Sequence, residues 1–162
     1  MALKILSADI TRLEVDAIVN AANTNLLAGG GVCGAIFRAA GYGELQAACD
    51  KLAPIQTGEA VITPGFNLPA KFIIHTAGPI WRGGQHCEEN LLRSCYVNSL
   101  TLAAEHNLQS VAFPLISSGI YGYPPRDALK VAVRAIENFL AERDIEVILT
   151  VLDKSLLVNE KD

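Results

Sequence analysis

The chain has 162 residues, of which 51% are apolar and 19% charged, so it has the size and composition of one globular domain. Its 13 basic and 17 acidic residues give a formal charge of −4 without any Lys/Arg cluster, which argues against a nucleic acid partner. No apolar run is long enough to span a bilayer, so we expect no membrane partner either. We expect residues 1–162 to form a single domain and the chain to be a monomer.

The N-terminal residues lack a basic segment followed by a long apolar stretch, so we expect no signal peptide. None of the four cysteines forms a CxxC pair, and we expect reduced thiols and a cytoplasmic location. His86 and Cys87 are adjacent, but no second pair has the spacing of zinc ligands. We therefore expect neither a metal nor a cofactor.

Short apolar runs alternate with helical patterns along the whole chain. In chain order, the patterns predict strands at Leu3–Ser7 and Asp16–Asn20, helices at Val32–Ala40 and Glu44–Leu52, and strands at Ala60–Thr63 and Lys71–Thr76. They then predict a helix at Glu88–Asn107, a strand at Val111–Ile116, a helix from Pro125, a strand at Ile145–Leu152 and a short helix after Asp153. This alternation predicts an α/β fold with three α/β/α layers around a mixed, mostly parallel sheet.

In such sheets, ligands bind beyond the carboxyl ends of the strands, so the loops after Asn20, Thr76 and Ile116 should share one rim. The loop after Asn20 contains three consecutive glycines, Gly29 to Gly31, directly before a helix. Glycines let the backbone approach a ligand closely, and the N-terminal end of a helix favours an anion. Asn20, Asn23 and Asn25 add donors and acceptors suited to sugar hydroxyls, although such side chains also stabilise turns.

The loop after Ile116 has the sequence SSGIYGYPP and also enters a helix. Ser117 and Ser118 can donate to phosphate oxygens, and Tyr121 offers an aromatic face to a ribose or a base. Gly119 and Gly122 again permit close approach of the backbone. Two glycine loops at corresponding places predict a pyrophosphate held between them, although each alone is also explained as a strand-to-helix turn.

Gly29, Gly31 and Gly34 also fit the GxGxxG pattern of nicotinamide-dependent oxidoreductases. That pattern normally follows its strand at once, with an acidic residue ending the next strand. A long loop separates Asn20 from Gly29, and no second strand is evident before Asp50. A nicotinamide-dependent oxidoreductase therefore stays as one further hypothesis, from a different class of protein.

Four motifs occur in order: ADITRLEVDAIVNAAN, GGGVCGAIFRAAG, TGEAVITPGFNLPAKFIIHTAGP and SSGIYGYP. They run from residue 8 to residue 124 of the 162, and the chain resembles macrodomains of the MacroD type, the Appr-1''-phosphate processing family. That resemblance implies binding of ADP-ribose or ADP-ribosylated proteins. It also implies hydrolysis of ADP-ribose esters, namely O-acetyl-ADP-ribose and ADP-ribosyl carboxylates.

The resemblance also implies roles for individual residues. Asp9 would bind the adenine amino group with Ile10 beside it, and Asn23 would bind the distal ribose. The implied contacts along the phosphates and distal ribose are Gly30, Gly31, Val32, Ser117, Ser118, Gly119, Ile120, Tyr121 and Gly122.

The family's hydrolase motif is Asn, six residues, Gly-Gly, an aliphatic residue and Asp. Here Asn23 is followed at the correct spacing by Gly30, Gly31 and Val32, but Cys33 stands in place of the aspartate. The aspartate is thought to activate the attacking water, whereas thiols are mostly protonated at neutral pH. With Asn23 and Cys33 as the candidate catalytic pair, the sequence leaves two functions open: a slow ester hydrolase and a non-catalytic reader of ADP-ribose.

His75 ends an apolar strand, and we interpret it as a core or supporting histidine rather than a catalytic one.

Overall fold

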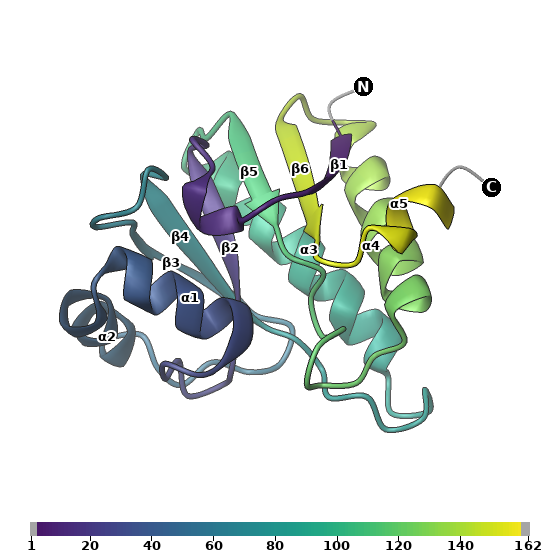
Figure 1. Cartoon of the computed structure of the whole chain (residues 1–162), viewed down its shortest axis with the longest axis horizontal. Helices are drawn as coiled ribbons and strands as arrows, with labels where there is room; N and C mark the ends of the chain where they lie inside the picture. The colour runs from purple at the N-terminus through teal and green to yellow at the C-terminus, as the bar shows by residue number, and fades with distance from the viewer. Residues whose placement is uncertain (1–2, 160–162) are drawn as a thin grey trace.

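A single six-stranded sheet organises the computed structural model, which describes residues 3–159 (Figure 1). The strands are β1 (Leu3–Ser7), β2 (Ala17–Ala22), β3 (Ala60–Pro64), β4 (Phe72–Ala77), β5 (Ser110–Phe113) and β6 (Glu146–Val151). They lie in the order β1-β6-β5-β2-β4-β3, and every neighbouring pair is parallel except β3 with β4. The predicted mixed, mostly parallel sheet is therefore confirmed.

Helices cover both faces of this sheet. They are η1 (Ile10–Arg12, a 3-10 turn), α1 (Gly31–Ala40), α2 (Tyr42–Asp50), α3 (Glu88–Glu105), α4 (Pro125–Leu140) and α5 (Ser155–Asn159). Figure 1 shows α1 and α2 in front of the sheet and α3 and α4 behind it. This is the expected α/β/α arrangement. Among the helices described, none is both long and apolar enough to cross a membrane.

Consecutive residues of a strand pack into the cores on opposite faces of the sheet, which explains why the strands are apolar throughout. Ile18 and Ile73 belong to the core beneath α1 and α2, whereas their chain neighbours Val19 and Ile74 belong to the core with α3 and α4. All four side chains are fully buried. The sheet is thus fixed from both sides, and its carboxyl ends can carry polar loops.

Strand β5 is shorter than the predicted Val111–Ile116, because the apolar run contains Pro114. Proline has no N–H to donate to a neighbouring strand. Beyond Phe113, the buried Tyr96 hydroxyl takes over from strand pairing: it donates to the Pro114 carbonyl (3.3 Å) and accepts from the Ile116 N–H (3.1 Å). The chain therefore leaves the sheet after Phe113, and three residues separate the strand from the serine–glycine loop.

Candidate functional site

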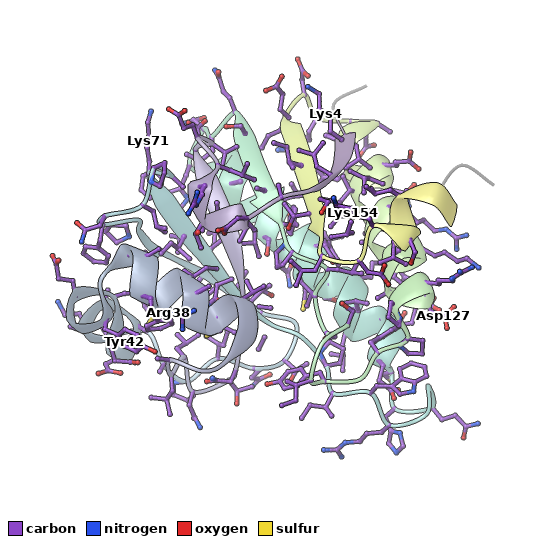
Figure 2. All side chains as sticks on the ribbon, in the orientation of Figure 1. Lys4, Arg38, Tyr42, Lys71, Asp127 and Lys154 are labelled. Atoms are coloured by element: carbon purple, nitrogen blue, oxygen red, sulfur yellow. The ribbon has the colours of Figure 1, made fainter. Side chains whose placement is uncertain are left out.

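Three loops meet at the carboxyl ends of β2, β4 and β5, along the lower edge of Figure 1. In Figure 2, Lys71, just before β4, lies at the upper left, and Asp127, in the first turn of α4, lies lower, at the right. A cavity of about 290 Å³ lies at this rim. Asn23 and Tyr121, from the two predicted loops, both line it.

The first loop runs from residue 23 to residue 33 and is closed by side-chain amides. The Asn23 amide accepts from the Leu27 N–H (3.0 Å) and donates to the Leu27 carbonyl (2.8 Å). The Gln46 amide on α2 accepts from the Ala28 N–H and donates to the Leu26 carbonyl, both at 3.0 Å. The Asn23 side chain therefore shapes this loop as well as facing the cavity.

The N-terminal end of α1 is open for a ligand. Gly30 precedes the helix without a side-chain cap, and Gly31 has a φ of +56°, a conformation that favours glycine. Within residues 3–159, the N–H groups from Gly29 to Cys33 have no hydrogen-bond acceptor. Gly34 is needed for packing, since a Cβ there would lie 2.5 Å from the Gly29 carbonyl oxygen.

The second loop runs from residue 117 to residue 123 and is tied down by hydroxyl groups. Ser117 is buried with a φ of +68°, and its Oγ donates to the Pro79 carbonyl (2.7 Å). The Ser118 Oγ donates to the Leu115 carbonyl (2.8 Å). The expectation that both hydroxyls face a phosphate is untested, but both are hydrogen-bonded inside the protein.

Backbone groups are the free donors of the second loop. The N–H groups of Gly119, Ile120 and Tyr121 have no acceptor in the described part of the chain. Nothing lies within 4 Å of where a Cβ of Gly119 would stand, and the Ile120 side chain is fully exposed. Each loop thus presents a run of unpaired N–H groups, and such runs attract anions.

A set of buried, hydrogen-bonded polar side chains lies against the first loop. The Asn20 Nδ2 donates to the His75 Nδ1 (3.1 Å), and the His75 Nε2 lies 3.0 Å from the Thr63 hydroxyl. Burial lowers the pKa of His75 to about 4, so its ring is neutral at neutral pH. The Asn20 Nδ2 also reaches the Cys33 Sγ (3.7 Å), which in turn lies 3.7 Å from the Leu27 carbonyl.

Cys33 is only 7% exposed, at the start of α1 and close to Asn23. A Cβ at Gly29 would lie 3.9 Å from both the Asn23 Nδ2 and the Cys33 Sγ. The two candidate catalytic residues are therefore brought together around Gly29. His75 lies deeper in the core, as expected for a supporting residue.

Asp9 follows β1 and does not line the cavity. Its Oδ1 accepts from the Thr11 hydroxyl (2.7 Å) and from the Thr11 N–H (3.0 Å), while its Oδ2 lies 3.6 Å from the Arg12 Nε. The hydrogen bonds from Thr11 hold the pKa of Asp9 below its ordinary value. Ile10, beside it, is buried in the core beneath α1.

The β4–α3 loop, residues 78–87, completes the rim, where the loop after Thr76 was expected, but the sequence did not indicate how Glu88 anchors it. The buried Glu88 carboxylate accepts from the N–H groups of Arg82 (2.8 Å), Gly84 (3.0 Å) and His86 (2.6 Å). Burial raises the pKa of Glu88, but these hydrogen bonds outweigh it and lower the pKa to about 2. The Trp81 N–H, donating to the Tyr121 carbonyl (2.8 Å), joins this loop to the second loop.

Nothing in residues 3–159 resembles a metal centre, since no group of three or more His, Cys, Asp or Glu side chains is placed to hold an ion.

Comparison with known proteins identifies the family. The Macro domain family model matches residues 19–132. The chain is 58% identical over 145 residues to a macro domain-containing protein of Chlorobaculum tepidum, covering 89% of this chain and 84% of that one. It is 53% identical over 142 residues to the O-acetyl-ADP-ribose deacetylase of Salmonella typhimurium, covering 85% and 79%.

Solved structures agree with the sequence relatives. The Oceanobacillus iheyensis macrodomain with ADP superposes with a TM-score of 0.90 at 41% identity, covering 99% of this chain and 93% of that one. The Trypanosoma brucei macrodomain in complex with ADP-ribose superposes with a TM-score of 0.88 at 37% identity, covering 97% and 66%. The chain therefore belongs to the macro domain family.

Proposed function

We propose that the chain binds ADP-ribose between the first and second loops. The observation that carries this proposal is the pair of unpaired N–H runs, Gly29–Cys33 and Gly119–Tyr121. Backbone N–H groups and a helix N-terminus can hold a pyrophosphate whatever the net charge of the protein, here −4. Similar macrodomains are known with ADP and with ADP-ribose, which supports the same ligand class here.

The sheet order suggests how the nucleotide lies. Asp9 follows the edge strand β1, whereas Asn23 follows β2, three places further along the sheet. We place the adenine at Asp9, whose Oδ2 has, within the described part of the chain, only the 3.6 Å contact with Arg12 and can accept from the amino group. The distal ribose then lies at Asn23, with Gly30, Gly31 and Val32 on one side and the second loop on the other.

We further propose slow hydrolysis of ADP-ribose esters. The Salmonella relative is an O-acetyl-ADP-ribose deacetylase, and the first loop keeps the motif spacing from Asn23 to Val32. The reaction needs a water held near the ester carbon or the anomeric carbon. A cysteine is a poor substitute for the carboxylate that would activate that water, while the loops would still position the substrate.

The alternative is a reader of ADP-ribose without turnover. It is favoured by the burial of Cys33, whose hydrogen-bond contacts are the Asn20 amide and the Leu27 carbonyl. Single-turnover assays with O-acetyl-ADP-ribose separate the two functions. Slow release of acetate above the uncatalysed rate supports the hydrolase. If the nucleotide binds and no acetate is released, the result supports a protein that binds ADP-ribose without turnover.

Thermal-shift assays with ADP-ribose and with NAD, added separately, test the oxidoreductase hypothesis. We expect stabilisation by ADP-ribose to exceed that by NAD.

We also propose that residues 1–162 act as a single monomeric domain in the cytoplasm, where the four free cysteines would stay reduced. Its partners would be ADP-ribose or ADP-ribosylated proteins.

A further inference from the structure

The rim cavity continues beyond the place proposed for the distal ribose. It begins at Asn23 and Thr24, after β2, and extends over Gly78 and Pro79, after β4. Strand β4 lies on the side of β2 away from β1, where Asp9 would hold the adenine. A nucleotide lying from Asp9 to Asn23 therefore points its far end into this cavity.

The size of the cavity exceeds what an acetyl ester needs. Its volume of about 290 Å³ is near the lower end for pockets that enclose whole small molecules. Thr24 and Thr57 supply hydroxyls, and Ile80 supplies an apolar wall that is half exposed. An amino-acid side chain with part of its flanking backbone matches this mixed lining.

Arg82 gives the cavity an available positive charge. Glu88 is the one carboxylate among its lining residues, and it is already hydrogen-bonded to the Arg82, Gly84 and His86 N–H groups. Over residues 3–159, the ion pairs are Asp9–Arg12, Asp16–Lys71 and Glu89–Arg93. The Arg82 guanidinium is in none of them, and the residue is exposed.

We propose that Arg82 makes this cavity, the acceptor cavity, selective for ADP-ribosylated peptides that carry further acidic residues beside the modified side chain. The inference rests on the proposed ADP-ribose binding. It adds to that function a specificity-determining residue outside the two glycine loops. The Glu88 carboxylate accepts from the Arg82 N–H, which holds the Arg82 backbone beside the cavity that its side chain lines.

Two triazole-linked ADP-ribosyl peptides, which cannot be hydrolysed, provide the test: one with acidic flanking residues and one with neutral ones. Calorimetry gives their affinities and that of free ADP-ribose for the wild-type chain, Arg82→Glu and Arg82→Ala. Arg134→Glu on α4 is the matched control, since it makes the same charge change on an exposed residue outside the cavity.

We expect the wild type to prefer the acidic peptide over the neutral one, and Arg82→Glu to reduce this preference by about threefold to tenfold. Arg82→Ala should reduce it less, Arg134→Glu should leave it unchanged, and 0.5 M salt should weaken it. A preference unchanged in Arg82→Glu would overturn the acceptor cavity while ADP-ribose binding stands. Failure of the wild type to bind free ADP-ribose would instead overturn the proposed function.

Discussion

Both glycine loops present unpaired backbone N–H groups, but different side chains hold the two loops in place. The first loop is closed by side-chain amides. It lies against three buried side chains, Asn20, His75 and Thr63, which are joined by hydrogen bonds. The second loop is held by hydroxyls: Ser117 on Pro79, Ser118 on Leu115 and Tyr96 at its base. The motif cysteine lies in the first loop, whereas the second loop supplies backbone N–H donors and the Tyr121 side chain, so we expect changes in the first loop to affect turnover and changes in the second to affect binding.

The largest expected effect is on folding stability in acid. His75 has a folded pKa of about 4, below its ordinary value of 6.5, so the unfolded chain binds the extra proton first. The stabilisation is complete above pH 6.5 and is lost as pH falls toward 4, by roughly 3 kcal/mol at most. Chemical denaturation between pH 7.5 and 4 measures it.

The variant His75→Gln should be less stable at pH 7.5 yet lose less stability between pH 6.5 and 4. The exposed His106→Gln serves as the control and should keep the wild-type slope. Equal slopes in all three proteins would show that His75 does not support the first loop in this way. The Tyr96 hydroxyl beneath the second loop does not titrate here, since burial raises its pKa.

The next largest effect concerns Cys33. Cys33→Asp should raise the single-turnover rate of O-acetyl-ADP-ribose hydrolysis about 100-fold, because a carboxylate can act as a general base. Cys33→Asn has nearly the same shape without the charge, and it should not raise the rate. A large loss of rate in Cys33→Ala, with ADP-ribose affinity intact, would show instead that the thiol is catalytic.

Gly119 tests the second loop without disturbing the fold. A Cβ there meets nothing within 4 Å, so Gly119→Val should fold normally and yet obstruct a ligand lying against the backbone. We expect ADP-ribose affinity to fall about 30-fold, roughly 2 kcal/mol. Gly43→Val on α2 is equally open and outside the cavity, so it should bind as the wild type does. Unchanged affinity in Gly119→Val would remove the second loop from the site.

A smaller effect is expected at Asp9. Asp9→Ala should weaken ADP-ribose binding about tenfold, since a charge-assisted hydrogen bond to the adenine is lost. Ribose 5-phosphate, which lacks adenine, should bind almost as before. Equal losses for both ligands would indicate that Asp9 only caps the turn at Thr11.

The sequence predicted the order and class of the elements because apolar periodicity is a local signal. The prediction of VAFPLI as one strand was wrong: the strand ends at Phe113, because Pro114 ends the pairing with the neighbouring strand, and the apolar pattern does not reveal this. The hydrogen bond from the Ser117 hydroxyl to the Pro79 carbonyl could not be predicted, because only folding brings these residues, 38 positions apart, together. Glu88 carried no recognisable pattern, since its partners are backbone N–H groups.

Titration calorimetry of the wild-type chain with ADP-ribose tests whether the nucleotide binds between the two glycine loops. We expect one site per chain with a dissociation constant in the micromolar range, about −8 kcal/mol. Absence of heat, together with absence of competition at millimolar ADP-ribose, would contradict binding between the two loops.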